Sequence, residues 1–263
     1  MNILDRIVAA KRTENEVRKN NCPVHELERS AHFDKPVLSF FDSLIKKEPS
    51  VIAEFKRKSP SKGIINNKAE VEQVASGYYS AGVSAMSVLT DSGFFGGSED
   101  DLGKVAKLSL LPLLRKEFII DEYQVIESKA IGASAILLIG AILSKSESKK
   151  LSSLAKNIGL EVLFEIHDES DLEKMDTEVR IAGVNNRDLK SFDINMDNSL
   201  RLLNMIPHEC LKVAESGFRT VKDVIEMYSH GYDAFLIGER FMRSENPSES
   251  AAEFMKDLKS HML

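Results

Sequence analysis

The sequence predicts an α/β fold, a single (β/α)8 barrel of the TIM type with a helical extension at its amino-terminal end. Three observations support this prediction: the length of 263 residues, a series of short apolar runs, and amphipathic stretches between those runs. One closed barrel of this kind has about 250 residues. The apolar runs are continuous rather than alternating, which is typical of parallel strands covered on both faces.

The elements follow in a regular order along the chain. Residues 1–47 are rather polar with helical periodicity, and we expect them to form an extension packed on the barrel. The eight apolar runs that follow are predicted as strands: 51–55, 85–89, 110–114, 135–139, 160–164, 181–184, 211–214 and 234–237. Amphipathic stretches such as 122–131 and 221–228 are predicted as the intervening helices.

The spacing of these runs favours one domain that covers residues 1–263. Residues 51–263 divide into eight units of about 27 residues, the length of one strand, one helix and two short loops. A doubly wound open sheet is the structural alternative, and it predicts a GxGxxG turn after an early strand. Residues 93–98 contain glycines, but their spacing differs and they follow the second strand, so the barrel is favoured.

Composition and charge exclude several classes of protein. The formal net charge of −6 argues against a nucleic-acid or membrane-surface binder, since those need a broad basic face. The longest apolar stretch, 135–143, is shorter than the roughly 20 residues that cross a bilayer. The first twelve residues alternate charged and apolar side chains, unlike a secretory signal, so we expect a cytoplasmic enzyme. Cys22 and Cys210 lack metal-ligand spacing, and we expect no metal site and no reactive thiol.

The segment after the first predicted strand carries an unusual density of charge. Alternate residues of an extended segment share a face, so Ile52, Glu54, Lys56 and Lys58 point the same way. That face carries a carboxylate between an apolar anchor and two ammonium groups. A solvated strand end is the structural alternative, and the ends of the other strands argue against it.

Polar side chains also end most of the other predicted strands. In a barrel of this kind the active site forms where the carboxyl ends of the strands converge. Each buried charge there is costly to desolvate unless it is paired, so a cluster of carboxylates and cations indicates chemistry, with a set of ion pairs at the barrel rim as the structural alternative. The residues at these ends are Thr90, Asp91, Lys116, Glu165, Asn185, Arg187, Glu215, Ser216 and Gly238.

Glycines after the last two strands predict a phosphate site. Residues 215–218 and 237–240 occupy the positions where such barrels hold a phosphate with backbone N–H groups. Glycine lets the backbone approach the anion, and Lys58 can add a charged contact. We therefore expect a phosphorylated small molecule as the substrate.

The chain resembles the indole-3-glycerol phosphate synthase family over essentially its whole length. The resemblance rests on five segments in order: residues 52–61, 87–91, 114–121, 183–189 and 214–217. It implies ring closure of 1-(2-carboxyphenylamino)-1-deoxyribulose 5-phosphate with loss of carbon dioxide and water, by general acid–base catalysis in tryptophan biosynthesis. It also implies a lyase that needs neither cofactor nor metal.

The resemblance assigns catalytic roles to residues of this chain. Lys116 matches the general acid of ring closure, and Glu165 is placed to stabilise the developing iminium or to orient Lys116. Glu54 and Lys56 match the acid–base pair of the dehydration, and Lys56 with Arg187 can neutralise the substrate carboxylate. Three further residues match positions that hold the substrate's hydroxyls and anilinic nitrogen: Asn185, Glu215 and Ser216.

Substrate-binding residues follow from the same resemblance. Phe95, Phe118 and Leu137 are similar to the apolar wall around the anthranilate ring, which would account for the uncharged end of the fourth strand. The remaining substrate-binding residues are Lys58, Ser59, Arg187, Gly217, Gly238 and Glu239. We expect His167 to lie behind the reacting groups or at the surface.

Two other functions remain as alternatives. Phosphoribosylanthranilate isomerase is a related phosphate-binding barrel, but it uses a Cys/Asp pair at strand ends, and neither cysteine here lies at one. The other alternative is a catalytically silent phosphate-binding barrel, which would not need acid and base together. We expect a monomer and leave a dimer open, and we expect residues 59–67 to form a lid over the site.

Overall fold

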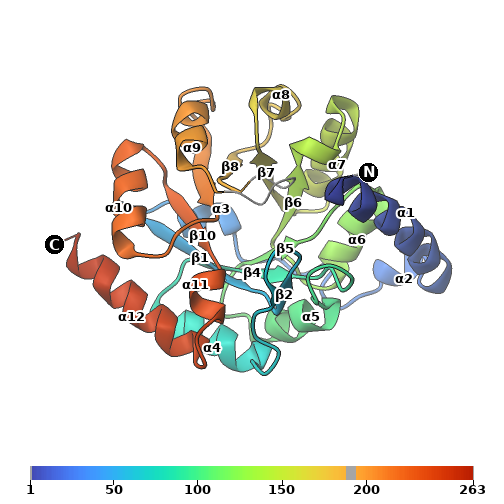
Figure 1. Cartoon of the computed structure of the whole chain (residues 1–263). Coiled ribbons are helices and arrows are strands. Elements are labelled where there is room, and N and C mark those ends of the chain that lie inside the picture. The colour runs from blue at the N-terminus through green and yellow to red at the C-terminus, as the bar shows by residue number, and fades with distance from the viewer. Residues whose placement is uncertain (1, 188–193, 263) are drawn as a thin grey trace.

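The computed structural model describes residues 2–187 and 194–262, and its centre is a closed barrel of parallel strands (Figure 1). Each barrel strand pairs with the next one along the chain, and β10 pairs with β1 to close the barrel. The strands are β1 (Ser50–Phe55), β4 (Ala85–Leu89), β5 (Leu113–Lys116), β6 (Ala135–Ile139), β7 (Glu161–Ile166), β8 (Ile181–Asn185), β9 (Leu211–Glu215) and β10 (Ala234–Ile237). The predicted (β/α)8 barrel is confirmed. Asp188 and Leu189, from the fourth segment of the family resemblance, lie outside the described residues.

Helices surround the strands on the outside of the barrel (Figure 1). They are α4 (Val71–Ala81), α5 (Glu99–Leu108), α6 (Glu122–Ala130), η1 (Gly140–Ile142), α7 (Lys145–Asn157), α8 (Glu169–Leu172), α9 (Met196–Leu203), α10 (Val221–His230), α11 (Glu239–Met242) and α12 (Pro247–Ser260). The amino-terminal extension is helical as predicted and contains α1 (Ile3–Asn21), α2 (Val24–Leu27) and α3 (Phe40–Leu44). The predicted lid segment forms a small antiparallel hairpin of β2 (Lys58–Ser59) and β3 (Gly63–Ile64).

Two apolar layers explain why the strand sequences are continuously hydrophobic. Ile52 and Leu114 belong to a cluster inside the barrel, whereas Val51 and Val88 pack beneath the helices. Both faces of each strand are therefore buried, as in other parallel sheets covered by helices. Glu54 lies on the same face of β1 as Ile52, so its side chain points into the barrel mouth.

Two strands differ from their predicted bounds by more than one residue. β5 begins at Leu113 rather than at residue 110, because Pro112 has no N–H to donate to the sheet. The Pro112 carbonyl still accepts a hydrogen bond from the Met86 N–H at 3.1 Å. β5 continues to Lys116 and β7 continues to Ile166, so Lys116 and Glu165 both lie within strands rather than beyond them. Backbone pairing with β4 and β8 therefore holds both residues in place.

Lys11 attaches α1 to the mouth of the barrel. Its side chain is 1% exposed, and Nζ lies 2.8 Å from Asp91 Oδ2, which follows β4, and 3.1 Å from Glu117 Oε1, which follows β5. Glu14 on α1 lies 2.8 Å from the same Nζ. Burial lowers the pKa of Lys11, but Glu117 and Asp91 more than offset it and raise the pKa overall. Lys11 is therefore a charged group on which two buried carboxylates depend.

Further along α1, polar side chains reach α6. Asn15 Nδ2 donates to Gln124 Oε1 at 3.0 Å, and Arg18 pairs with Glu127 at 3.0 Å. Glu127 also pairs at 2.7 Å with Arg115 of β5, whose side chain is fully buried. These contacts join α1, α6 and β5 into one polar layer, so α1 is part of the folded barrel rather than an appendage.

We expect Lys11→Met to lower the free energy of unfolding by about 3–5 kcal/mol, because it leaves Asp91 and Glu117 buried without their cation. Chemical denaturation with two spectroscopic probes measures this change. Lys19→Met is the matched control on the same helix, since the Lys19–Asp121 pair is partly exposed and contributes at most about 1 kcal/mol. Equal effects of the two substitutions would contradict the role assigned to Lys11.

Candidate active site

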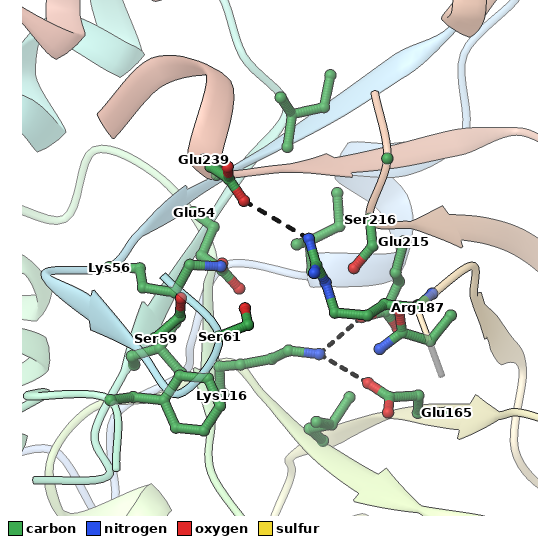
Figure 2. A pocket seen from close by; sticks show the side chains of 18 of the residues that line it. Glu54, Lys56, Ser59, Ser61, Lys116, Glu165, Arg187, Glu215, Ser216 and Glu239 are labelled. Atoms are coloured by element: carbon green, nitrogen blue, oxygen red, sulfur yellow. Dashed lines mark hydrogen bonds and ion pairs between the residues drawn. The ribbon is translucent and has the colours of Figure 1, made fainter. Parts of the chain in front are cut away.

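A cavity opens at the carboxyl ends of the strands, and each of the eight barrel strands contributes to its lining (Figure 2). The structure brings together the catalytic and substrate-binding residues that the resemblance implied, except Lys58: Glu54, Lys56, Ser59, Phe95, Lys116, Phe118, Leu137, Glu165, Asn185, Arg187, Glu215, Ser216, Gly217, Gly238 and Glu239. Thr90 and Asp91, which also follow a predicted strand, are buried and do not line this cavity, since Thr90 donates to Glu117 and Asp91 pairs with Lys11. Lys58 lies in β2, and its Cβ would be 3.3 Å from a Cβ added at Gly96. No described residue of 2–47 lines this cavity.

Lys116 bridges two carboxylates at the centre of the cavity (Figure 2). Its Nζ donates to Glu165 Oε2 at 2.8 Å and to Glu215 Oε2 at 2.6 Å. The Lys116 side chain is 14% exposed, whereas the two carboxylates are 2% and 1% exposed. Gly183 on β8 leaves space for Glu215, because a Cβ there would lie 2.4 Å from Glu215 Oε1. The three charges are therefore buried together and depend on one another.

The pKa values of the two carboxyl groups move in opposite directions. Burial raises the pKa of Glu215 to about 8, and Glu165 raises it as well, while Lys116 opposes the shift. Burial also acts on Glu165, but Lys116 and then His167 more than offset it, so the pKa of Glu165 falls to about 2. Burial lowers the pKa of Lys116, yet Glu165, Glu215 and Glu54 raise it overall. Near neutral pH the trio is therefore one ammonium, one carboxylate and one neutral carboxylic acid.

A second acid–base pair lies on β1 and just beyond it. Lys56 Nζ donates to Glu54 Oε1 at 2.5 Å, with the Lys56 side chain 18% exposed and that of Glu54 3% exposed. Gly238, at the end of β10, allows this arrangement: a Cβ there would lie 2.6 Å from Glu54 Oε1 and 2.9 Å from Glu54 Cβ. The pair thus lies beside Gly238, which follows β10.

One side of the cavity is apolar. The rings of Phe95 and Phe118 lie 5.8 Å apart at an interplanar angle of 36°, and Leu137 lines the same cavity. Asp91 holds Phe95 by accepting its backbone N–H at 2.9 Å, and Glu117 accepts the Phe118 N–H at 2.8 Å. The same two carboxylates bind the ammonium of α1 described above, so the extension supports this wall without lining the cavity.

The opposite side carries glycines and an ion pair. Ser216 and Gly217 both have positive φ, 68° and 91°, which turns the chain sharply after β9. The Arg187 guanidinium reaches across to Glu239, 3.5 Å away, at the start of α11 (Figure 2). The cavity therefore has an apolar side, a charged centre and a glycine-rich side.

Several lining residues were not predicted as part of the site: Pro60, Ser61, Leu89, Glu117, Ile139 and Leu236. Phe218, Ile237 and Arg240 also line the cavity, and they lie in the segments 215–218 and 237–240 that were expected to hold a phosphate. Glu117 could have been found, because it follows Lys116 at a strand end and is a carboxylate at a buried position. Ser61 lies in the Ser/Pro/Gly segment after β1, which was interpreted as a lid rather than as cavity lining.

Three further observations concern metal binding, membrane-spanning helices and the two cysteine thiols. Among the described residues no cluster of His, Cys, Asp and Glu could hold a metal ion. None of the helices in residues 2–187 and 194–262 is both long and apolar enough to cross a membrane. Burial raises the pKa of Cys22 and of Cys210, which disfavours the reactive thiolate.

Comparison with known proteins identifies relatives along nearly the whole chain. The family model described as indole-3-glycerol phosphate synthase matches residues 4–254. An indole-3-glycerol phosphate synthase from Bacteroides thetaiotaomicron is 39% identical over 256 residues, covering 97% of this chain and 98% of the relative. One from Acetivibrio thermocellus is 41% identical over 257 residues, covering 96% of this chain and 98% of the relative.

Solved structures with low sequence identity share the fold. The tryptophan synthase α subunit from Legionella pneumophila has a TM-score of 0.62 at 10% identity, covering 84% of this chain and 97% of that one. The 3-hexulose-6-phosphate synthase from Salmonella typhimurium has a TM-score of 0.62 at 13% identity, covering 81% and 99%. At such identities the likeness supports the barrel architecture alone.

We expect one carboxyl group of the free protein to titrate near pH 8, because burial beside Glu165 holds the proton on Glu215. Carbon-13 NMR of protein labelled at its glutamate carboxyl carbons, recorded across the neutral range, measures this titration. The resonance should vanish in Glu215→Gln and persist in Glu209→Gln, which removes an exposed carboxylate. Titration of every glutamate near the ordinary value of 4.5 would contradict the assignment.

The same shifts predict opposite pH dependences of stability. The contribution of Glu215 is complete below the ordinary value of 4.5 and declines as the pH rises towards 8. The contribution of Glu165 is complete above 4.5 and is lost as the pH falls towards 2. Glu215→Gln should therefore flatten the pH dependence of the unfolding free energy between pH 4.5 and about 8. Glu165→Gln should flatten it between pH 4.5 and about 2.

Proposed function

Because the chain belongs to the indole-3-glycerol phosphate synthase family, we propose that the charged side chains of its cavity divide among themselves the acid and base steps of that family's reaction. The chain is a carboxy-lyase of tryptophan biosynthesis. It converts 1-(2-carboxyphenylamino)-1-deoxyribulose 5-phosphate into indole-3-glycerol phosphate, with loss of carbon dioxide and water. The observation that carries the proposed assignment is the buried Lys116 between Glu165 and Glu215.

The two sides of the cavity suggest how the substrate lies. The aromatic ring fits the apolar wall of Phe95, Phe118 and Leu137. The phosphate fits the opposite side, where Gly217 and Gly238 expose backbone after β9 and β10, as in other barrels that bind phosphate. The reacting ketone then lies between the two ends, above Lys116.

Ring closure requires an acid at the ketone oxygen. The ring carbon that bears the carboxylate attacks the ketone carbon, and negative charge develops on the oxygen. Lys116 is charged and points into the cavity, so it can donate a proton to that oxygen. Glu165 keeps the ammonium aligned through the 2.8 Å hydrogen bond. The ring then becomes aromatic again as the bond to the carboxylate carbon breaks and carbon dioxide leaves.

The carboxylate needs neutralisation before it departs, and the hydroxyl left by ring closure must then be removed. Lys56 and Arg187 line the cavity and provide two cations for the carboxylate. For the dehydration, Lys56 can protonate the departing hydroxyl while Glu54 takes up the proton released as the double bond forms. The 2.5 Å contact between Glu54 and Lys56 supports this proposed pairing.

Glu215, Asn185 and Ser216 complete the proposed polar lining. With its pKa near 8, Glu215 carries a proton at neutral pH and can donate a hydrogen bond to a substrate oxygen or nitrogen. Asn185 and Ser216 offer an amide and a hydroxyl at neighbouring positions of the cavity. We assign these three residues to the substrate's hydroxyls and anilinic nitrogen.

Glu239 requires a separate assignment because its carboxylate would repel a phosphate. Its side chain pairs with Arg187 at 3.5 Å and with Arg243 at 3.0 Å, which neutralises it locally. We propose that the backbone N–H at the start of α11, rather than the carboxylate, contacts the phosphate. Lys58 remains a candidate for a second, electrostatic contact from β2.

One chain supplies every group used in these steps. All eight strands of the same barrel line the cavity, which supports a monomer as the active unit. Residues 1–263 then act as a single domain, and we place the reaction in the cytoplasm with the other steps of amino-acid biosynthesis. A catalytically silent phosphate-binding barrel is not favoured, since it would not need a buried ammonium between two carboxyl groups.

We expect Lys116→Met to reduce turnover by about a hundredfold to ten-thousandfold, the usual contribution of a positioned acid. Indole fluorescence after addition of 1-(2-carboxyphenylamino)-1-deoxyribulose 5-phosphate measures the rate. Lys62→Met is the control, because Lys62 is exposed on the hairpin loop after β1. Substrate binding without turnover by the wild-type protein would support the silent barrel instead.

We also expect Gly238→Ala to lower kcat/KM by about a hundredfold, because a Cβ there displaces Glu54 and narrows the proposed phosphate site. Competition by inorganic phosphate, measured in the same assay, should weaken in parallel. Gly103→Ala on α5 is the control, since a Cβ there meets no atom within 4 Å. Unchanged phosphate competition in Gly238→Ala would contradict the proposed phosphate position.

A further inference from the structure

His167 is a mostly buried imidazole beside the active site that the acid–base steps above do not use. It lies one residue beyond β7 and two beyond Glu165, and its side chain is 14% exposed. Its Nε2 lies 3.4 Å from Glu165 Oε1, and its Nδ1 lies 3.8 Å from Asp171 Oδ2. The ring therefore stands between two buried carboxylates, one of which holds Lys116.

The main chain of His167 is held on both sides. Its N–H donates to Asp171 Oδ2 at 3.1 Å, and its carbonyl accepts from Asn198 Nδ2 at 2.9 Å. Asp171 is itself fixed, because Lys174 Nζ donates to its Oδ1 at 3.1 Å. A Cβ at Gly140 would lie 2.7 Å from Asp171 Cβ, so the backbone after β6 packs directly against this residue. These contacts fix the main chain from which the imidazole extends.

The two oxygens of Glu165 have different neighbours. Oε2 accepts the hydrogen bond from Lys116, whereas Oε1 faces His167. Within residues 2–187 and 194–262, neither buried ring nitrogen of His167 has a hydrogen-bond partner. A buried N–H without a partner is costly, so the ring has a strong preference for a nearby acceptor. Glu165 Oε1 is the nearer of the two carboxylate oxygens.

We propose that His167 is a positioning residue, which holds Glu165 through Oε1 and so aligns the carboxylate on Lys116. The arrangement is a chain of four groups, Asp171, His167, Glu165 and Lys116. The proposal rests on the assignment of Lys116 as the acid of ring closure, and it adds two residues, His167 and Asp171, to the groups that hold Lys116 in place. Electrostatics agree with the geometry, since His167 is among the groups that lower the pKa of Glu165.

Charged groups from several elements surround the imidazole. Glu165 comes from β7, Asp171 from α8 and Lys174 from the turn after it. A cleft that His167 lines also contains Asp5 and Arg12 of α1, Asp168, and Arg201 of α9.

The test compares His167→Leu with His167→Gln in the indole fluorescence assay. Leucine removes the donor, and kcat should fall by about tenfold to a hundredfold, the factor for a lost hydrogen bond to a charged group, with little change in KM. Glutamine can still donate to Glu165 Oε1, so it should recover most of kcat. His208→Leu, an exposed histidine before β9, is the control.

A double-mutant cycle separates positioning from a merely structural role. In a Glu165→Gln background, His167→Leu should cause little further loss of kcat, because the group it positions is already neutral. Equal losses in both backgrounds, or a wild-type kcat in folded His167→Leu, would overturn the proposal. Wild-type activity of Glu165→Gln alone would instead refute the assignment of Glu165, which keeps the two failures distinct.

A further pair of variants covers the case in which His167→Leu does not fold. His167→Asn has a shorter side chain that cannot reach Glu165, whereas His167→Gln can. The proposal predicts a higher kcat for the glutamine variant at the same thermal stability. Equal kcat values for the two folded variants would contradict it.

Discussion

The structure depends on one constraint, which is that a charged lysine is buried at the point where the eight strands converge. An ammonium in such a position requires compensation, since an unpaired buried ion is costly. Glu165 and Glu215 supply it from β7 and β9, and Gly183 leaves the space that Glu215 occupies. Two carboxyl groups facing one cation cannot both be ionised cheaply, so one of them keeps its proton. The same arrangement that keeps Lys116 charged therefore also creates a neutral acid beside it.

The amino-terminal extension serves the site from a distance. Lys11 of α1 ends between Asp91 and Glu117, and these carboxylates accept backbone N–H groups of Phe95 and Phe118. The extension is thus connected to the apolar wall through two buried ion pairs rather than through direct contact with the cavity. Each of these carboxylates both pairs with Lys11 and accepts a backbone N–H from the apolar wall. The packing of α1 and the positions of Phe95 and Phe118 therefore depend on the same two side chains.

Much of the site could be predicted from the sequence because position along a strand determines direction. Glu54 follows Ile52 by two residues, so both lie on the inner face of β1. Lys116 is the last residue of β5, and Glu165 is the last but one of β7. Lys58 follows the same parity but lies in the β2 hairpin, where the strand rule no longer applies. The role of Lys11 could not be predicted from the sequence, because Lys11 is one cation among several on α1. It becomes buried only when α1 packs on the barrel.

The sequence by itself determined the barrel, the order of its strands and the chemical types gathered at their carboxyl ends, since these follow from the hydrophobic period and the spacing of short elements. Only the tertiary structure decided which cation meets which carboxylate and which group holds a proton. Lys116 could have paired with any of the carboxylates at the mouth, and the closed barrel places it against Glu165 and Glu215. The physical reason is that ionisation depends on burial and on distances of a few ångströms, and residues far apart in the chain set both.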